Sequence, residues 1–418
     1  MDDIKKNLAV NGGKPVIQGS LKNRHNIGIE EKNAVMAMFD NAIETGRAPG
    51  YNGPEEEMLC LDFAKFMGGG FADAVNSGTT AVYVALRALD IEPFSEVIVS
   101  PVTDPGGMMP IVMNNCIPVV ADSVSGSYNT GAAQIETRIT ENTRAIVVSH
   151  IMGEPADMPS IMKLAEKHGL KVLEDCAQSH AARLGGKLVG TFGHVAAFST
   201  MFGKHFNTGG QGGMVFTKDE EIYWRIRQYA DRGKPFGMQA GATNCVASLN
   251  FNLSDMAAAI GIEQLKKLNG YVRSRRTLAG MLAKGFANLE SIEVPEILPD
   301  AEPSYWFMRL RFNGDSLVCG KAEFLDAVEA EGVNMIKDYG IARPYLMDWF
   351  INKKAFGTGG FPWTAPQYKG KYTGGFECPN ADRAIADCFN LTVYESWGEE
   401  EAGLILKAFK KVEQAYTK

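Results

Sequence analysis

One lysine stands in an unusual setting, between an apolar segment and a run of glycines. Lys204 and His205 lie in the middle of "AFSTMFGKHFNTGGQGGMVFT", residues 197 to 217. At its ordinary pKa of about 10.4, a lysine amine is mostly protonated and is a poor nucleophile. Desolvation or a neighbouring cation lowers that pKa and activates the amine for covalent bonding to a carbonyl compound. Lys204 is therefore a candidate nucleophile, although an ordinary lysine beside a glycine loop remains the alternative from this stretch alone.

Two carboxylates follow an apolar run in "VLEDCAQSH", residues 172 to 180. A buried carboxylate is costly unless a cation pairs with it. Asp175, the second of these carboxylates, is therefore expected to pair either with a cationic side chain or with a cationic ligand. A protonated heterocyclic nitrogen would be a suitable ligand partner.

Two further stretches place small and polar residues before a helix. In "NSGTTAVYVAL", residues 76 to 86, Gly78 allows close backbone approach, and the first helical N–H groups form an anion site. The alternative is an ordinary helix whose Ser and Thr act only as caps. In "SLNFNLSDMAAAIG", residues 248 to 261, Asn250 precedes a helix of small residues, and its alternative is a turn or cap asparagine.

The elements that carry these residues alternate between strand and helix. Seven short apolar runs predict strands: "FADAVN", "EVIVSPV", "IPVVADS", "AIVVSHI", "KVLEDCA", "HVAAFST" and "GMVFT". Several are continuous in Val and Ile, as in strands buried on both faces. Helical segments such as "TTAVYVALRALD" and "PSIMKLAEKHG" lie between them. This order predicts an α/β fold with a mostly parallel seven-stranded sheet flanked by helices.

The second half of the chain changes character. Residues 219–233 and 253–290 are expected to be helical, and the longer helix could link two lobes. A strand-like "YWFMRLRF", further helices and a Gly- and Pro-rich stretch predict a smaller α+β domain. We predict a large domain over residues 51–265, a small C-terminal domain over 266–418, and an N-terminal segment, 1–50, that packs on the small domain.

Composition excludes several classes of protein. The 418 residues are 45% hydrophobic with a net charge of −7, which argues against nucleic acid as a partner. The start of the chain lacks a signal-peptide pattern, and no run approaches a membrane span of about 18 apolar residues. The seven cysteines form no CxxC pair, so we expect reduced thiols, a cytoplasmic location and no metal site.

In open α/β sheets, ligands bind beyond the carboxyl ends of the strands, where the four stretches should meet. A phosphate cradle, a carboxylate and an amine around one pocket are what pyridoxal 5'-phosphate (PLP) requires. The carboxylate keeps the pyridine nitrogen protonated, the helix start holds the phosphate and the lysine bonds to the aldehyde.

From about residue 50 to its end, the chain resembles the DegT/StrS family of PLP-dependent sugar aminotransferases of fold type I. The motifs that carry the resemblance are "VNSGTTAVYVALRAL", "TRAIVVSHIMGEPADM", "VLEDCAQSHAARLGGKLVGTFGHVAAFS", "GKHFNTGGQGG" and "NFNLSDMAAAIGIEQL". The resemblance implies an aminotransferase that moves an amino group from glutamate or glutamine to a keto sugar or keto cyclitol. The late "CPNADRAIADCFNLTVY" is similar to members that act on cyclitols and aminoshikimate-type compounds.

Roles follow from the resemblance position by position. Lys204 would form the internal aldimine and shuttle the proton, Asp175 would pair with the pyridinium nitrogen, and Gln178 would contact the 3-hydroxyl side of the cofactor.

The phosphate would be held by four residues of one subunit: Gly78, Thr79, Thr80 and Ser199. Asn250 would reach the same phosphate from a neighbouring subunit, which implies a homodimer with shared active sites.

The chain also departs from the family pattern. Asp104 stands where an aromatic residue usually stacks on the pyridine ring, and Asn252 replaces the arginine of an "N-x-R-M" motif. Asp104 is therefore a candidate substrate contact, as are His180 and Tyr339.

The loop after the lysine is one residue longer than usual, which creates an ambiguity of register. Counting forward from Ser199 puts Lys204 at the catalytic position, whereas counting backward from "QGG" puts His205 there. A histidine at that position is typical of relatives that are deoxysugar dehydratases. The strand-end serine favours Lys204, and the alternatives are a dehydratase that uses His205 or a non-catalytic regulatory relative.

Overall fold

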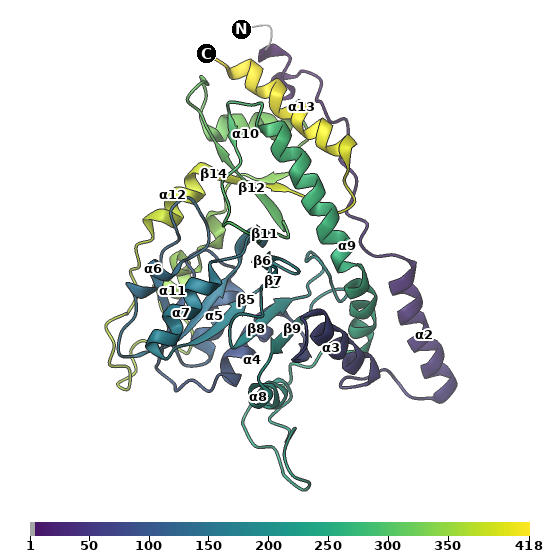
Figure 1. The fold of residues 1–418 in the computed structure, drawn as a ribbon, viewed down its shortest axis with the longest axis vertical. Coiled ribbons are helices and arrows are strands. Elements are labelled where there is room, and N and C mark those ends of the chain that lie inside the picture. The colour runs from purple at the N-terminus through teal and green to yellow at the C-terminus, as the bar shows by residue number, and fades with distance from the viewer. Residues whose placement is uncertain (1–4) are drawn as a thin grey trace.

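The computed structural model describes residues 5–418. Its centre is a large sheet that helices surround (Figure 1). The seven strands of this sheet have the order β1-β9-β8-β5-β4-β2-β3. The strands are β1 (Phe71–Val75), β2 (Glu96–Val99), β3 (Ile117–Val120), β4 (Thr143–Ser149), β5 (Lys171–Asp175), β8 (Val195–Ser199) and β9 (Gly213–Thr217). Only β9 runs antiparallel to the other six, because it pairs antiparallel with both β1 and β8. The predicted mostly parallel seven-stranded sheet is confirmed.

Burial explains why these runs form strands. Every residue of β2, β3, β8 and β9 is buried, as expected for a sheet covered on both faces. The covering helices are α3 (Pro54–Phe66), α4 (Gly78–Ala88), α5 (Pro105–Met113), α6 (Ala132–Glu136), α7 (Met158–His168) and α8 (Glu220–Ala230). Gly169 ends α7 in the left-handed conformation, at φ 64°, which glycine adopts readily.

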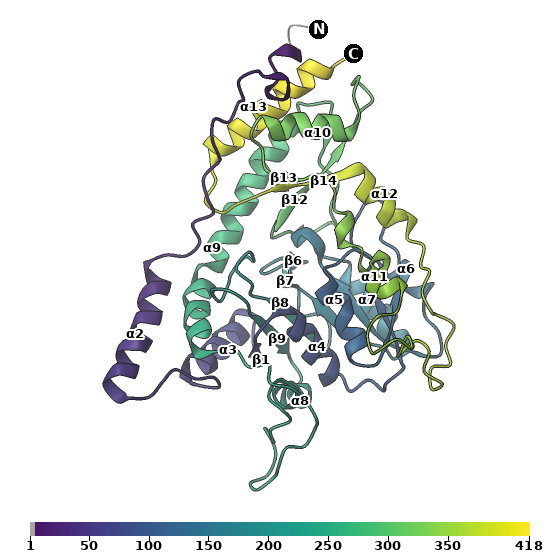
Figure 2. The same ribbon diagram turned by 180° about the vertical axis from the view of Figure 1, so that it is seen from behind.

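A second, smaller α+β unit lies at the far end of the long helix α9 (Asp255–Phe286) (Figure 2). Its four-stranded sheet has the order β10-β12-β14-β13, with strands β10 (Ile292–Glu293), β12 (Phe307–Phe312), β13 (Met335–Ile336) and β14 (Cys388–Thr392). Helices α10 (Lys321–Ala330) and α13 (Glu399–Tyr416) share its hydrophobic core. Buried side chains of α11 (Asp348–Ile351) and α12 (Pro379–Asp387) belong instead to the core around the large sheet, and α12 also contacts β14. A small three-stranded sheet joins β6 (Arg183–Leu184) and β7 (Lys187–Leu188) to β11 (Ala301–Glu302).

The N-terminal segment contacts both parts of the molecule. Leu8 and Ile17 are buried in the core of the smaller unit, whereas α2 (Ile29–Thr45) packs along α9. The domain boundary that we predict at residue 265 falls inside α9, and the start of the predicted N-terminal segment, residues 1–4, lies outside the described residues. The division into three segments stays a prediction.

Across residues 5–418, no helix combines the length and the apolar character needed to cross a bilayer.

Candidate active site

The predicted site residues lie at the edge of the large sheet where the parallel strands end. Asp175 is the last residue of β5, Ser199 is the last residue of β8, and Gly78 begins α4 directly after β1. Together with Thr79, Asp104 and Lys204 they line one cavity of about 200 Å³. The sequence therefore predicted which strand ends and loops meet at this edge.

The amine of Lys204 lies in this cavity with little access to water. The residue is 7% exposed, and burial lowers the pKa of its amine to about 8, although the carboxylates of Asp175 and Asp104 act in the opposite direction. Its Nζ lies 3.8 Å from the ring centroid of Trp306, a cation–π contact. An amine with this pKa is partly neutral near pH 8 and can attack a carbonyl carbon.

Asp175 faces the same cavity and is almost fully buried. Its Oδ1 accepts a hydrogen bond from the backbone N–H of Ala177 at 3.0 Å, and Ser149 Oγ lies 3.5 Å from Oδ2. Burial raises the pKa of the Asp175 carboxyl, while the Ala177 N–H and the amine of Lys204 lower it. A cationic ring nitrogen beside this carboxylate would stabilise its ionised form.

The start of α4 forms a cradle of backbone N–H groups. Ser77 caps the helix by accepting a hydrogen bond from Thr80 N at 3.1 Å, and the hydroxyl of Thr80 bonds back to Ser77 and to Asn76. Gly78 and Thr79 line the cavity, whereas the side chain of Thr80 serves the cap. A helix N-terminus of this kind favours an anion.

The cradle also fits the phosphate because its backbone lies close to the neighbouring strand end. A Cβ built on Gly78 would lie only 2.5 Å from the Cβ of Ser199, and one on Gly107 would lie 2.8 Å from Asp175 Oδ2. Glycine at both positions therefore lets the helix start lie directly against Ser199 and the Gly107 backbone lie against Asp175, and this close packing shapes the cavity that a flat ring and its phosphate would enter.

We expect Gly78→Ala to weaken PLP binding by about 10- to 100-fold. The added methyl group would overpack against Ser199 and push the helix start out of place, and overpacking of this kind costs about 1–3 kcal/mol. Titration of the cofactor-free protein with PLP, followed by protein fluorescence, measures this change. The matched control is Gly280→Ala in α9, where a Cβ meets nothing within 4 Å. Equal PLP affinity for both variants would contradict this account of the cradle.

Asp104 does not replace the missing aromatic residue. It is the N-cap of α5, and its Oδ1 accepts a hydrogen bond from Gly106 N at 2.8 Å. None of the described residues that line the cavity is aromatic; on the Asp104 side the lining is formed by Gly106 and Gly107. The described lining therefore offers no aromatic side chain that could stack on a pyridine ring, and the substrate role of Asp104 stays a prediction.

Gln178 and Tyr339 lie next to each other outside the lining of this cavity. Gln178 accepts a hydrogen bond from Met152 N at 2.9 Å through Oε1, and its Nε2 donates to Tyr339 Oη at 3.2 Å. Burial raises the pKa of the Tyr339 phenol, so this hydroxyl stays protonated. Their predicted contacts with cofactor and substrate stay predictions.

The side chains of Lys204 and His205 show which of the two residues faces the cavity. Lys204 lines the cavity, whereas His205 is fully buried behind it and donates its Nε2–H to Ser304 O at 3.1 Å. Burial keeps the pKa of His205 well below its usual value, so the ring is neutral. The position that faces Asp175 and Ser199 is that of Lys204, and the alternative based on His205 finds no support in this geometry.

Two predicted residues lie away from the cavity lining. His180 is buried between the rings of Phe198 and Phe206, with centroid distances of 5.6 and 5.3 Å. Burial lowers the pKa of His180 to about 3. Asn250 accepts a hydrogen bond from Asn252 Nδ2 at 2.7 Å. The roles predicted for His180 and Asn250 stay predictions.

Sequence reasoning missed two residues that contact Lys204. Trp306 lies under its amine, and Arg24 donates to its backbone carbonyl at 2.6 Å. Both belong to segments about 100 to 180 residues away in the chain. No motif marks either residue, so only a contact map could have found them.

An activated lysine, a buried carboxylate and a helix-start cradle on this sheet define an enzyme of the PLP-dependent fold type I class. The match to a family model agrees, since the model of the DegT/DnrJ/EryC1/StrS aminotransferase family covers residues 30–410. The chain belongs to this family, whose cofactor is PLP.

Individual relatives point the same way. GDP-perosamine synthase of Escherichia coli O157:H7 is 32% identical over 57% of this chain and 65% of the relative. The dTDP-3-amino-3,4,6-trideoxy-alpha-D-glucose transaminase of Streptomyces venezuelae is 32% identical over 69% of this chain and 74% of the relative. The crystal structure of DesV from S. venezuelae in complex with a ketimine intermediate matches with a TM-score of 0.77 and 27% identity, covering 92% of this chain and 96% of that one.

Proposed function

We propose that this protein is a PLP-dependent aminotransferase that moves an amino group from glutamate or glutamine to a keto sugar or keto cyclitol. The observation that carries the proposal is the amine of Lys204, which lies in the cavity beside Asp175 with its pKa lowered to about 8. The amine can therefore bond covalently at near-neutral pH and can both take up and release a proton.

When bound, PLP supplies an aldehyde carbon and a protonated pyridine ring that withdraws electrons from the reacting bond. The chain contributes three functions. The carboxylate of Asp175 would hold positive charge at the ring nitrogen, and the N–H groups at the start of α4 would bind the phosphate. Lys204 would hold and move the proton, because its buried amine lines the same cavity and its pKa of about 8 lets it both take up and release a proton near neutral pH.

The names of two relatives support a sugar as the acceptor. Both GDP-perosamine synthase and the dTDP-sugar transaminase are named for nucleotide-linked amino sugars. The dehydratase alternative needs a histidine at the position that Lys204 occupies in the cavity, so the geometry favours transamination.

The direct test supplies the purified, PLP-loaded protein with glutamate or glutamine and a panel of free and nucleotide-linked keto sugars and keto cyclitols. Formation of an amino sugar or amino cyclitol together with 2-oxoglutarate or 2-oxoglutaramate supports the proposal. Loss of water without consumption of the donor would identify a dehydratase, and no reaction across the panel would favour a regulatory relative.

The active unit is proposed to be a homodimer with shared sites. Exposed apolar side chains follow one stripe of α2, which projects away from the large sheet: Ile29, Met36, Phe39 and Ile43. On α3, Met58 and Leu61 are exposed as well. An apolar surface of this kind is typical of a subunit interface, and a second copy of this chain would cover it.

Mixing two inactive variants tests the shared site. In a heterodimer of Lys204→Ala and Asn250→Ala subunits, one of the two sites contains both mutations and the other contains neither. We expect random mixing to restore about a quarter of the wild-type activity, because half of the dimers are mixed. Measured activity at the level of the two separate variants would contradict a shared site, and sedimentation of the mixture checks that dimers form.

We also propose a cytoplasmic location. All seven cysteines of the chain are free thiols, and five of them are buried. Thiols in this state fit a reducing compartment.

A further inference from the structure

The N-terminal segment contacts the loop that carries the candidate nucleophile, which we call the lysine loop (residues 201–207). The guanidinium of Arg24 donates from Nη2 to the backbone carbonyl of Lys204 at 2.6 Å and to that of His205 at 3.3 Å. Its Nη1 donates to Phe202 O at 3.4 Å. One side chain thus binds three backbone carbonyls of the lysine loop.

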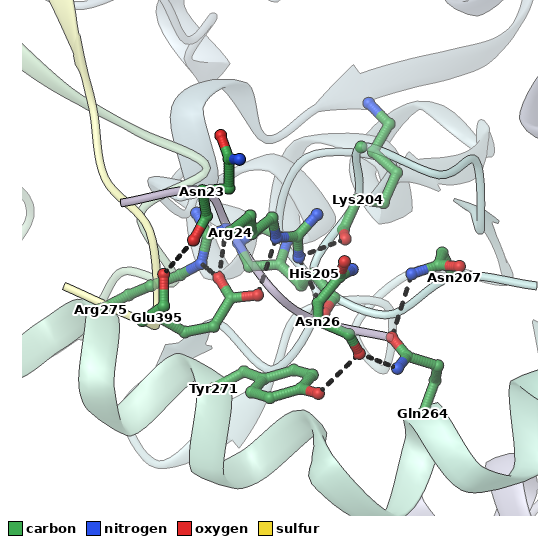
Figure 3. A network of polar contacts seen from close by, with 12 residues as sticks. Asn23, Arg24, Asn26, Lys204, His205, Asn207, Gln264, Tyr271, Arg275 and Glu395 are labelled. Carbon is green, nitrogen blue, oxygen red and sulfur yellow. Dashed lines mark hydrogen bonds and ion pairs between the residues drawn. The ribbon is translucent and has the colours of Figure 1, made fainter. Parts of the chain in front are cut away.

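The same guanidinium is fixed from its other side by the smaller unit. Nε of Arg24 donates to Glu395 at 2.7 Å, and Glu395 also pairs with Arg275 of α9 at 2.6 Å (Figure 3). All three side chains are largely buried, with exposed fractions of 12% for Arg24, 4% for Glu395 and 1% for Arg275. A planar guanidinium held by a carboxylate is pre-organised, so little freedom is lost when it binds the carbonyls.

Further bonds hold the lysine loop from the same direction. Trp306 donates from Nε1 to Gly203 O at 3.2 Å, and the neutral ring of His205 donates to Ser304 O. At the end of the loop, Asn207 donates to Gln264 of α9 at 3.0 Å.

Gln264 continues the network to the N-terminal segment. Its Nε2 donates to Asn26 O at 2.5 Å, and Tyr271 also donates to that carbonyl, at 3.0 Å. The N-terminal segment is thereby fixed two residues after Arg24.

The backbone of Lys204 and its amine face opposite ways. Figure 3 shows the carbonyl of Lys204 directed at Arg24 and its side chain extending away from the guanidinium. The amine ends in the cavity with Asp175. We propose that Arg24 is a positioning residue, which fixes the backbone of the lysine loop so that the amine of Lys204 is presented to the cofactor cavity. This inference rests on the proposed role of Lys204.

This arrangement also couples two parts of the molecule. Glu395 follows β14 in the smaller unit, whereas the lysine loop follows β8 of the large sheet. Arg24 bridges them, so a movement of Glu395 with the smaller unit would reach the backbone carbonyl of Lys204 through the Arg24 guanidinium. A reaction in two half-reactions with different substrates requires the amine of Lys204 to occupy the same position in each of them, and a fixed backbone at Lys204 would favour this.

The test compares Arg24→Ala and Arg24→Lys with the control Lys22→Ala. Lys22 lies in the same segment and pairs with Glu400 and Glu401, but it makes no hydrogen bond with the lysine loop in the described structure. The first measurement is amide hydrogen exchange of residues 201–207 in the cofactor-free protein. The second is the pH dependence of reductive methylation at residue 204, followed by mass spectrometry.

For Arg24→Ala we expect exchange in the lysine loop to be about tenfold faster or more, because the loop opens locally. We expect the methylation midpoint to rise from about 8 toward the value of an exposed lysine, since the amine leaves its desolvated position. In the loaded enzyme kcat should fall by about 10²-fold with KM little changed. Added guanidinium ion should restore part of the loss, and Arg24→Lys should lie between.

Exchange and methylation equal to those of Lys22→Ala would overturn the proposal, as would a loss that guanidinium does not relieve. If Arg24→Ala does not fold, Arg24→Lys still decides the question, because a lysine can serve only part of the three-carbonyl contact. Neither exchange nor methylation requires turnover, so failure of the proposed aminotransferase activity would be recognised separately.

Discussion

Replacing Lys204 by alanine is expected to abolish covalent capture of PLP and to lower turnover by about 10⁴-fold or more. In the proposed function the amine is both the nucleophile that bonds to the cofactor and the group that moves the proton, so two functions would be lost at once. No other described lysine lines the cavity. Borohydride fixation of the cofactor, followed by mass spectrometry of the peptide that contains residue 204, measures the first loss, and steady-state kinetics measure the second.

The control is Lys167→Ala, which removes an exposed lysine paired with Glu136 on the surface. It should capture the cofactor and turn over like the wild type. If Lys204→Ala still produced an amino sugar at a comparable rate, the assignment of Lys204 as the catalytic amine would be wrong. Capture at another lysine would have the same meaning.

The wild-type protein adds a dependence on pH. Because burial lowers the pKa of Lys204 to about 8, the fraction of neutral amine rises as the pH rises and levels off above that value. The rate at which the cofactor-free protein captures added PLP is therefore expected to rise up to about pH 8. An exposed lysine would instead continue to gain reactivity up to about pH 10.

The sequence could predict which strand ends form the site, because the patterns that mark strands and their ends lie within short stretches of the chain. The Val- and Ile-rich runs predict buried strands, and the carboxyl ends of parallel strands meet at one edge, which brings Asp175, Ser199 and Gly78 together. Anchoring the register at Ser199 places Lys204, and not His205, in the cavity.

Other features depend on contacts that no local pattern encodes. Trp306 and Arg24 reach Lys204 from distant segments, and their residue types are ordinary for a strand and a surface loop. The partners of Asn250 across a subunit interface would likewise depend on another copy of the chain.

The substitution Asp175→Asn should separate two effects of the buried carboxylate, which are its effect on turnover and its effect on the stability of the folded protein. Asparagine keeps the size of the side chain but cannot hold positive charge at the cofactor nitrogen, so turnover is expected to fall by about 10²- to 10³-fold. Because the Asp175 carboxylate raises the pKa of Lys204, its removal should also shift the onset of PLP capture to lower pH. Kinetics and the pH profile of capture measure both effects, with exposed Asp326→Asn as the control.

The same substitution, Asp175→Asn, is expected to leave the stability of the cofactor-free protein unchanged or to raise it, although it lowers turnover. Burial raises the pKa of Asp175 in the folded state, so folding favours the protonated form, and at pH 7 the ionised carboxyl lowers the stability relative to a neutral group. Asp175→Asn should therefore keep or raise Tm at pH 7, and the gain should shrink as the pH falls toward the pKa of an unfolded aspartate. A lower Tm at pH 7 would mean that Asp175 is mainly a structural ion-pair partner. If Asp175 serves to bind a cationic ring nitrogen, the Asp175→Asn variant should be at least as stable as the wild type and much less active.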